Sequence, residues 1–188
     1  METCYKKHII DISWTAEAGS PLKQTGRIGR IITWDYPLGD ISDRYSFPIE
    51  TDFMTFALTN EILKVPFKVI ELPFSRYGLE FHPFKQTDWD GWIFTDLKYI
   101  RERFKWKHIT SNRSTSVYGM LKQELGDYSA FLSGDTYKAT IKYQGKVVTE
   151  MGDYYGSLPE LNNFILLEAR KLIDNMITAR GDQLNLDL

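Results

Sequence analysis

Residues 137–150 read YKATIKYQGKVVTE and carry the clearest secondary-structure pattern in the chain. Polar and apolar residues alternate on both sides of Gln144-Gly145, as in a two-stranded antiparallel hairpin joined by a tight turn. Ser157-Leu-Pro-Glu160 follows closely, with the spacing of a helix capping box and a proline in the first turn. The sequence therefore predicts a hairpin that leads directly into a helix.

Apolar residues recur every three or four positions after this capping box, as on the buried face of a helix. They are Leu158, Leu161, Ile165, Ala169, Leu172 and Met176. Arg180-Gly181 supplies a terminal charge and a terminating glycine. We predict that helix 157–180 covers a sheet and that residues 182–188 form a flexible tail.

The first half of the chain predicts mainly strands. Residues 8–15 (HIIDISWT) and 27–34 (RIGRIITW) are rich in β-branched residues, and the turn-forming segment 17–26 between them favours their pairing. A helix is predicted to start after Thr51 or Asp52 and to end before Pro66. Further strands are predicted at residues 67–72 and 77–84.

The middle of the chain predicts two helices. Trp89, Ile93, Leu97, Ile100 and Phe104 recur at intervals of three or four, which indicates a helix over residues 89–107. After a polar break at residues 110–115, a shorter helix carries Val117, Leu121 and Leu125 and is predicted to end at Gly126.

These elements predict a single α+β domain over residues 1–181. Its main feature is an antiparallel sheet of about five to seven strands, with three or four helices packed on it. The 188 residues contain 43% hydrophobic residues and no repeat or linker, so one self-sufficient core is expected.

Composition excludes several classes of protein. The net charge of −2 does not fit a globally basic nucleic-acid binder. Cys4 is the single cysteine, and no zinc or cofactor motif is present, so we expect no disulfide, metal or cofactor. No secretion signal or apolar run of about 20 residues is found. We therefore expect a cytoplasmic protein, including the cytoplasm of a host cell, with no membrane partner.

Two patterns are candidates for a charged binding site. Lys98, Arg101 and Lys105 fall on one flank of the predicted helix 89–107, where they can meet an acidic protein or nucleic-acid phosphates. Residues 25–30 read TGRIGR, and glycines beside arginines let a backbone approach a phosphate. Because strands are predicted around TGRIGR, we interpret it as a bulge or the start of a strand.

Aromatic residues in predicted loops are the other candidates for partner binding. Trp34 and Tyr36 lie in one loop, and Trp89 and Trp92 lie at the start of a predicted helix. Large aromatic side chains bury much area for little loss of entropy, which favours them as interface anchors. Their alternative role is to close the ends of the core.

Three carboxylates suggest an enzyme instead. Asp11, Glu61 and Glu71 lie on elements whose order resembles that of ribonuclease H folds, which implies a metal-dependent nuclease. That chemistry requires the three carboxylates to converge.

No intact set of catalytic residues is present, so our main hypothesis is a non-catalytic protein-binding or inhibitor protein. Phage-encoded inhibitors and toxin immunity proteins are examples of this type. The expected contact residues are Trp34, Tyr36, Trp89, Trp92, Lys98, Arg101 and Lys105. The alternatives are the nuclease, a nucleic-acid-binding module that uses the basic flank, and contact with a second copy of the chain.

Overall fold

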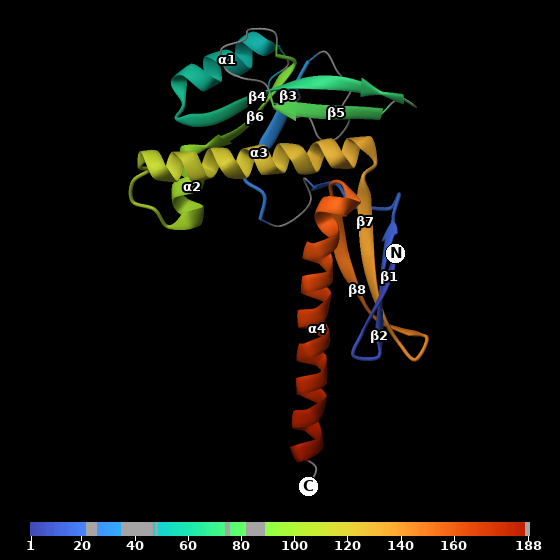
Figure 1. The fold of residues 1–188 in the computed structure, drawn as a ribbon. Helices are drawn as coiled ribbons and strands as arrows, with labels where there is room; N and C mark the ends of the chain where they lie inside the picture. The colour runs from blue at the N-terminus through green and yellow to red at the C-terminus, as the bar shows by residue number, and fades with distance from the viewer. Residues whose placement is uncertain (22–25, 35–46, 48, 74–75, 82–88, 187–188) are drawn as a thin grey trace. The chain divides into compact units, whose positions relative to one another are not determined.

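The computed structural model describes residues 1–21, 26–34, 47, 49–73, 76–81 and 89–186. The fold is α+β, with four helices and two antiparallel sheets of four strands within these residues (Figure 1). The fold class predicted from the sequence is confirmed, although the strands are divided between two sheets.

Contacts between residues in the folded structure divide the chain into two compact units. The terminal unit comprises Met1–Ala18 and Gly134–Leu188, and the inserted unit comprises Gly19–Ser133. That residues 1–181 behave as one domain, with a flexible tail after them, stays a prediction.

The terminal unit contains a four-stranded antiparallel sheet in the order β1-β2-β7-β8. Its strands are β1 (Glu2–Tyr5), β2 (His8–Trp14), β7 (Thr136–Tyr143) and β8 (Lys146–Tyr155). Gln144 and Gly145 join β7 to β8 with φ of 50° and 77°, the left-handed conformation that a two-residue hairpin turn requires. The predicted hairpin is confirmed.

Helix α4 (Leu158–Leu186) lies against one face of this sheet (Figure 1). Ser157 donates a hydrogen bond from its Oγ to the carboxylate of Glu160 at 2.7 Å, within the predicted capping sequence. The core between helix and sheet is made of fully buried small and branched residues: Ile10, Ile12, Ala139, Ile141, Ile165, Ala169 and Ile173. The apolar stripe of the sequence thus faces the sheet as predicted, and the helix continues past residue 180.

The inserted unit contains the second sheet, in the order β3-β6-β4-β5. Its strands are β3 (Arg30–Thr33), β4 (Ile62–Leu72), β5 (Arg76–Phe81) and β6 (Gly91–Asp96). Its helices are α1 (Glu50–Thr59), α2 (Leu97–Phe104) and α3 (Ser111–Ser133). Helices α1 and α3 lie on either side of the sheet (Figure 1). The sheet is therefore the middle layer of three.

Two apolar cores result from this arrangement. One contains Val117, Leu121 and Leu125 of α3 with Val65 and Ile93 of the sheet. The other contains Phe53 of α1, which lies 4.9 Å from Phe94 between ring centroids. Alternate side chains of β6 enter the two cores, because successive residues of a strand point to opposite faces.

Three sequence predictions are wrong for identifiable reasons. Residues 91–96 form strand β6 rather than a helix, because a strand covered on both faces has the same continuous apolar pattern as a buried helix. Helix α3 starts at Ser111 and runs through Gly126 to Ser133, since its packing on the sheet outweighs a single glycine. Strands β2 and β3 do not pair, because they belong to different sheets.

Pro66 lies inside β4, which the sequence placed only at residues 67–72. It pairs with Trp92 of β6, whereas the pairing of β4 with β5 starts at Phe67. One side of β4 therefore lacks a strand at Pro66, where a residue without an N–H is tolerated. None of the helices in the described part of the chain combines the length and apolarity needed to cross a membrane.

Candidate functional site

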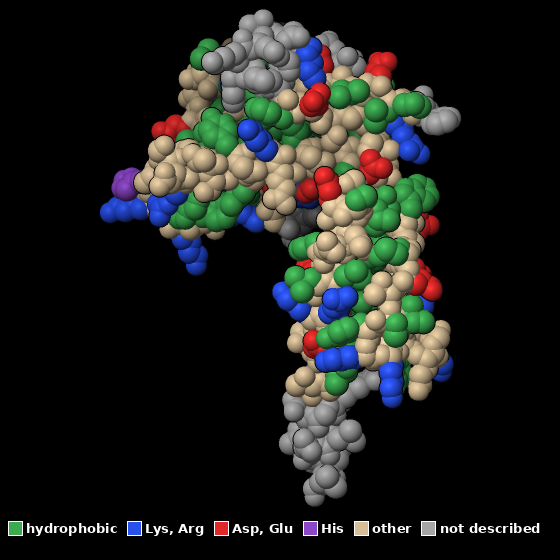
Figure 2. Space-filling model, viewed as in Figure 1, with side chains coloured by type: hydrophobic (Ala, Val, Ile, Leu, Met, Phe, Trp, Pro, Cys, Tyr) green, Lys and Arg blue, Asp and Glu red, His purple; other side chains and the backbone are tan. Residues whose placement is uncertain are grey.

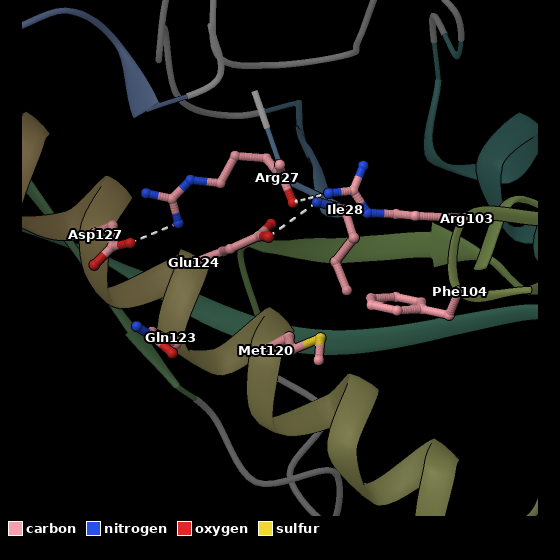
Figure 3. Close-up of a pocket in the computed structure, with 9 residues that line it drawn as sticks. Arg27, Ile28, Arg103, Phe104, Met120, Gln123, Glu124 and Asp127 are labelled. Atoms are coloured by element: carbon pink, nitrogen blue, oxygen red, sulfur yellow. Dashed lines mark hydrogen bonds and ion pairs between the residues drawn. The ribbon is translucent and has the colours of Figure 1, made fainter. Parts of the chain in front are cut away.

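A cavity of about 450 Å³ opens between residues 26–28, the end of α2 and the middle of α3 (Figure 3). Its lining is Gly26, Arg27, Ile28, Arg103, Phe104, Met120, Gln123, Glu124 and Asp127. The TGRIGR segment and the basic helix, two separate candidates in the sequence, therefore contribute to one site. All of its residues belong to the inserted unit.

Glu124 forms the polar wall of the cavity. Its Oε1 accepts a hydrogen bond from the backbone N–H of Ile28 at 2.9 Å, and its Oε2 accepts one from Gly29 at 2.7 Å. Burial raises the pKa of the Glu124 carboxyl, and these two hydrogen bonds oppose the rise. The backbone that could approach a phosphate thus already binds a carboxylate of the protein itself.

Gly29 is required for this contact. A Cβ at residue 29 would lie 2.7 Å from Oε2 of Glu124 and 2.7 Å from Cδ1 of Ile93. Both distances are below a normal van der Waals contact, so a side chain here would displace the carboxylate or the core. The strand-start interpretation of TGRIGR agrees with this geometry, since β3 begins at Arg30.

Arg27 and Asp127 form a partly buried ion pair beside Glu124. The guanidinium Nη1 lies 2.5 Å from Oδ2 of Asp127, and in Figure 3 the Arg27 side chain extends toward α3. Burial raises the pKa of Asp127, and Arg27 partly offsets the rise. Both carboxylates of the cavity thus have partners within the protein.

The opposite side of the cavity has a cationic rim and an apolar floor. Arg103 donates hydrogen bonds to the backbone oxygen of Gly26 at 2.9 Å and to the hydroxyl of Tyr99 at 3.2 Å. It forms no salt bridge with any carboxylate of the described residues. The side chains of Ile28, Phe104 and Met120 converge below it (Figure 3).

Helix α2 positions Arg103 and presents several other cations. The Asp96 carboxylate caps its start by accepting from the backbone N–H of Lys98 at 2.6 Å. Lys105 ends it with a φ of 54°, and its N–H bonds to the last carbonyls of the helix. A well-capped helix of only eight residues therefore holds these cations in a defined arrangement.

The cations of α2 and the turn after it form what we call the α2 surface: Lys98, Arg101, Arg103, Lys105 and Lys107. Residues 97–113 contain six cationic side chains and one carboxylate, a net charge of +5 in a chain of net charge −2. Figure 2 shows Lys and Arg side chains gathered at the end of the inserted unit where Figure 1 places α2. Lys98, Lys105 and Lys107 are exposed.

The predicted basic residues Lys98 and Arg101 lie on α2, and Lys105 is its C-cap residue. Arg101 forms a salt bridge with Glu61 at 2.8 Å, with both side chains substantially exposed. Such exposed pairs contribute little to stability, about 0–1 kcal/mol, so Arg101 remains accessible to a competing carboxylate.

The predicted aromatic residues do not form one exposed patch within the described residues. Trp92 is 2% exposed and lies in the core beneath α1. Trp89 is half-buried, 4.7 Å from Trp92 between ring centroids, and Trp34 donates from its Nε1 to the backbone oxygen of Phe47 at 2.9 Å. Tyr36 lies outside the described residues. The described rings act as core closures, the alternative that the sequence left open.

The three carboxylates of the nuclease hypothesis do not converge. Glu61 precedes strand β4 and Glu71 lies near its end, so at about 3.3 Å per residue they are roughly 30 Å apart. Asp11 lies in the terminal unit and accepts a hydrogen bond from Lys142 at 3.0 Å. Within the described residues, no group of three His, Cys, Asp or Glu side chains could hold a metal ion.

Sequence reasoning missed the two carboxylates of the cavity. Glu124 lies three residues after Leu121 and directly before Leu125, so it interrupts the apolar face of α3. A carboxylate within an apolar stripe signals a buried polar contact.

Searches against family models, curated proteins and solved structures find no match to this chain.

Proposed function

We propose that this chain is a non-catalytic binding protein that docks on an acidic surface of another protein through its α2 surface. The observation that carries the proposal is the concentration of positive charge on one short capped helix and the turn after it, in an otherwise acidic chain. Three exposed lysines of the α2 surface, Lys98, Lys105 and Lys107, form no salt bridge with a described carboxylate. Cations arranged in this way attract an oppositely charged partner and orient it.

The contacts of Trp106, in the turn after α2, favour a protein partner over a nucleic acid. Single-stranded nucleic acids bind by stacking bases on free aromatic faces. Trp106 stacks on Phe104 at 4.9 Å between centroids, and the guanidinium of Arg113 lies 4.8 Å from the Trp106 ring. Contacts within the protein thus already use this ring, which leaves less free aromatic surface on which a base could stack.

A binding measurement with defined probes tests the proposal. The probe is a fluorescent hepta-glutamate peptide, a minimal acidic protein surface, and its anisotropy is followed at low and at physiological salt. The site variant combines Lys98→Glu with Lys107→Glu. The control variant combines Lys146→Glu with Lys171→Glu, two exposed lysines of the terminal unit, and makes the same change in net charge.

We expect the site variant to bind the peptide at least about tenfold more weakly than wild type, a difference of about 1.4 kcal/mol. The control variant should lose much less affinity for the peptide, because its substitutions change only the long-range electrostatic potential at the α2 surface. Equal losses in both variants would contradict a local site. A thymidine oligonucleotide that binds more tightly than the peptide, and loses affinity in the site variant alone, would replace the protein partner with nucleic acid.

A further inference from the structure

The cavity adjoins the α2 surface because Arg103 belongs to both. A partner segment that pairs with Arg103 therefore reaches the mouth of the cavity. The volume of about 450 Å³ lies within the range of roughly 300–1,000 Å³ found for pockets that enclose small molecules. It is large enough to enclose one amino-acid side chain of any type.

The lining indicates which side chain fits. Phe104 and Met120 are half-buried and offer an apolar contact area beside the buried Ile28. The negative charge of Asp127 is balanced by Arg27, and Glu124 is held by two backbone N–H groups. Each of these charged groups thus already has a partner within the protein, which favours an apolar body over an ion.

The polar wall adds a second requirement. Each carboxylate oxygen has two lone pairs, so Glu124 and Asp127 keep acceptor capacity beyond the hydrogen bonds described. A large aromatic side chain that also carries an N–H or O–H satisfies both parts of the lining. Tryptophan and tyrosine have this combination, and with arginine they dominate the anchor residues of protein interfaces.

We propose that the cavity receives a tryptophan or tyrosine side chain from an acidic segment of the partner protein. The inference rests on the proposed function, because the carboxylates of the same segment bind the α2 surface. Arg103 then lies between the two contacts and pairs with a carboxylate next to the aromatic residue. The partner site is thus an aromatic residue flanked by glutamate or aspartate.

Two peptides test this inference separately from the proposed function. Each contains six glutamates, with a central alanine in one peptide and a central tryptophan in the other. Gln123→Trp fills the mouth of the cavity from an exposed position of α3 and leaves the core residues unchanged. Thr115→Trp, also exposed on α3 but outside the lining, is the matched control. Circular dichroism confirms that both variants are folded.

We expect wild type and Thr115→Trp to bind the tryptophan peptide at least about tenfold more tightly than the alanine peptide. In Gln123→Trp this preference should disappear, while the affinity for the alanine peptide stays within about twofold. Equal binding of both peptides by wild type overturns the cavity inference and leaves the proposed function standing. A preference that survives Gln123→Trp also overturns it, and the failure of both peptides to bind overturns both proposals.

Discussion

Replacement of Glu124 by glutamine tests how the cavity is built. The carboxylate is 7% exposed, and each of its oxygens accepts one backbone N–H, from Ile28 and Gly29. In Glu124→Gln one oxygen becomes an NH₂ group, which can donate but cannot accept. One backbone N–H then faces another donor and is left unsatisfied, at a cost of about 1–3 kcal/mol. We therefore expect Glu124→Gln to lower the free energy of unfolding by this amount.

The pH dependence of this loss follows from the pKa of Glu124. Burial raises this pKa, so the folded protein binds a proton at Glu124 more readily than the unfolded chain does. The contribution of the Glu124 carboxyl to the free energy of unfolding of wild type consequently increases as pH falls through the folded pKa. It decreases as pH rises through the folded pKa. A protonated carboxyl can still accept at both oxygens, whereas glutamine cannot. The deficit of Glu124→Gln should therefore be larger at pH 5 than at pH 7.

Urea unfolding followed by far-ultraviolet circular dichroism at both pH values measures these differences. The midpoint should fall without a change in the m-value, because the surface exposed on unfolding is unchanged. Glu102→Gln, at an exposed carboxylate of α2, is the matched control and should stay within about 0.5 kcal/mol of wild type. A variant Glu124→Gln as stable as wild type would refute the reasoning, since desolvation of the carboxylate would then outweigh both hydrogen bonds.

Three further substitutions test the structure around the site and in the terminal unit. Gly29→Ala places a Cβ 2.7 Å from Ile93 Cδ1 and should lower stability by about 1–3 kcal/mol in urea unfolding; an unchanged midpoint would contradict the close approach. Phe53→Ala empties a fully buried position between α1 and the sheet and should cost about 3–5 kcal/mol, whereas the exposed Leu58→Ala on the same helix should change stability by less than about 0.5 kcal/mol. Gln144→Asn supplies the residue that a two-residue hairpin turn favours at positive φ and should raise the melting temperature, while Gln144→Val should lower it.

The local elements of the terminal unit could be predicted from the sequence. The alternation around Gln144-Gly145 and the stripe from Leu158 to Met176 each specify a single element, since strand and helix periods differ. The secondary structure in the middle of the chain was harder to predict. Trp92, Ile93 and Phe94 are buried on a strand covered from both faces, and a continuous apolar run carries no period that separates strand from helix.

The candidate site could be predicted only in part. Lys98, Arg101 and Lys105 were identified because charges on one flank of a helix are visible in its spacing, even though the helix is shorter than expected. Arg103 is not among the contact residues predicted from the sequence. Its role depends on Gly26, whose backbone oxygen it reaches from 77 residues further along the chain.

The sequence alone determined the α+β class, the antiparallel hairpin, the C-terminal helix and the local excess of positive charge near residue 100. Each of these depends on residues close together in the chain. The tertiary structure alone decided that the strands divide into two sheets, that Trp34, Trp89 and Trp92 close a core and that TGRIGR binds Glu124. These outcomes depend on contacts between segments that are far apart in the chain. The local sequence pattern of one segment does not indicate which other segment it will contact, so such contacts cannot be read from the sequence.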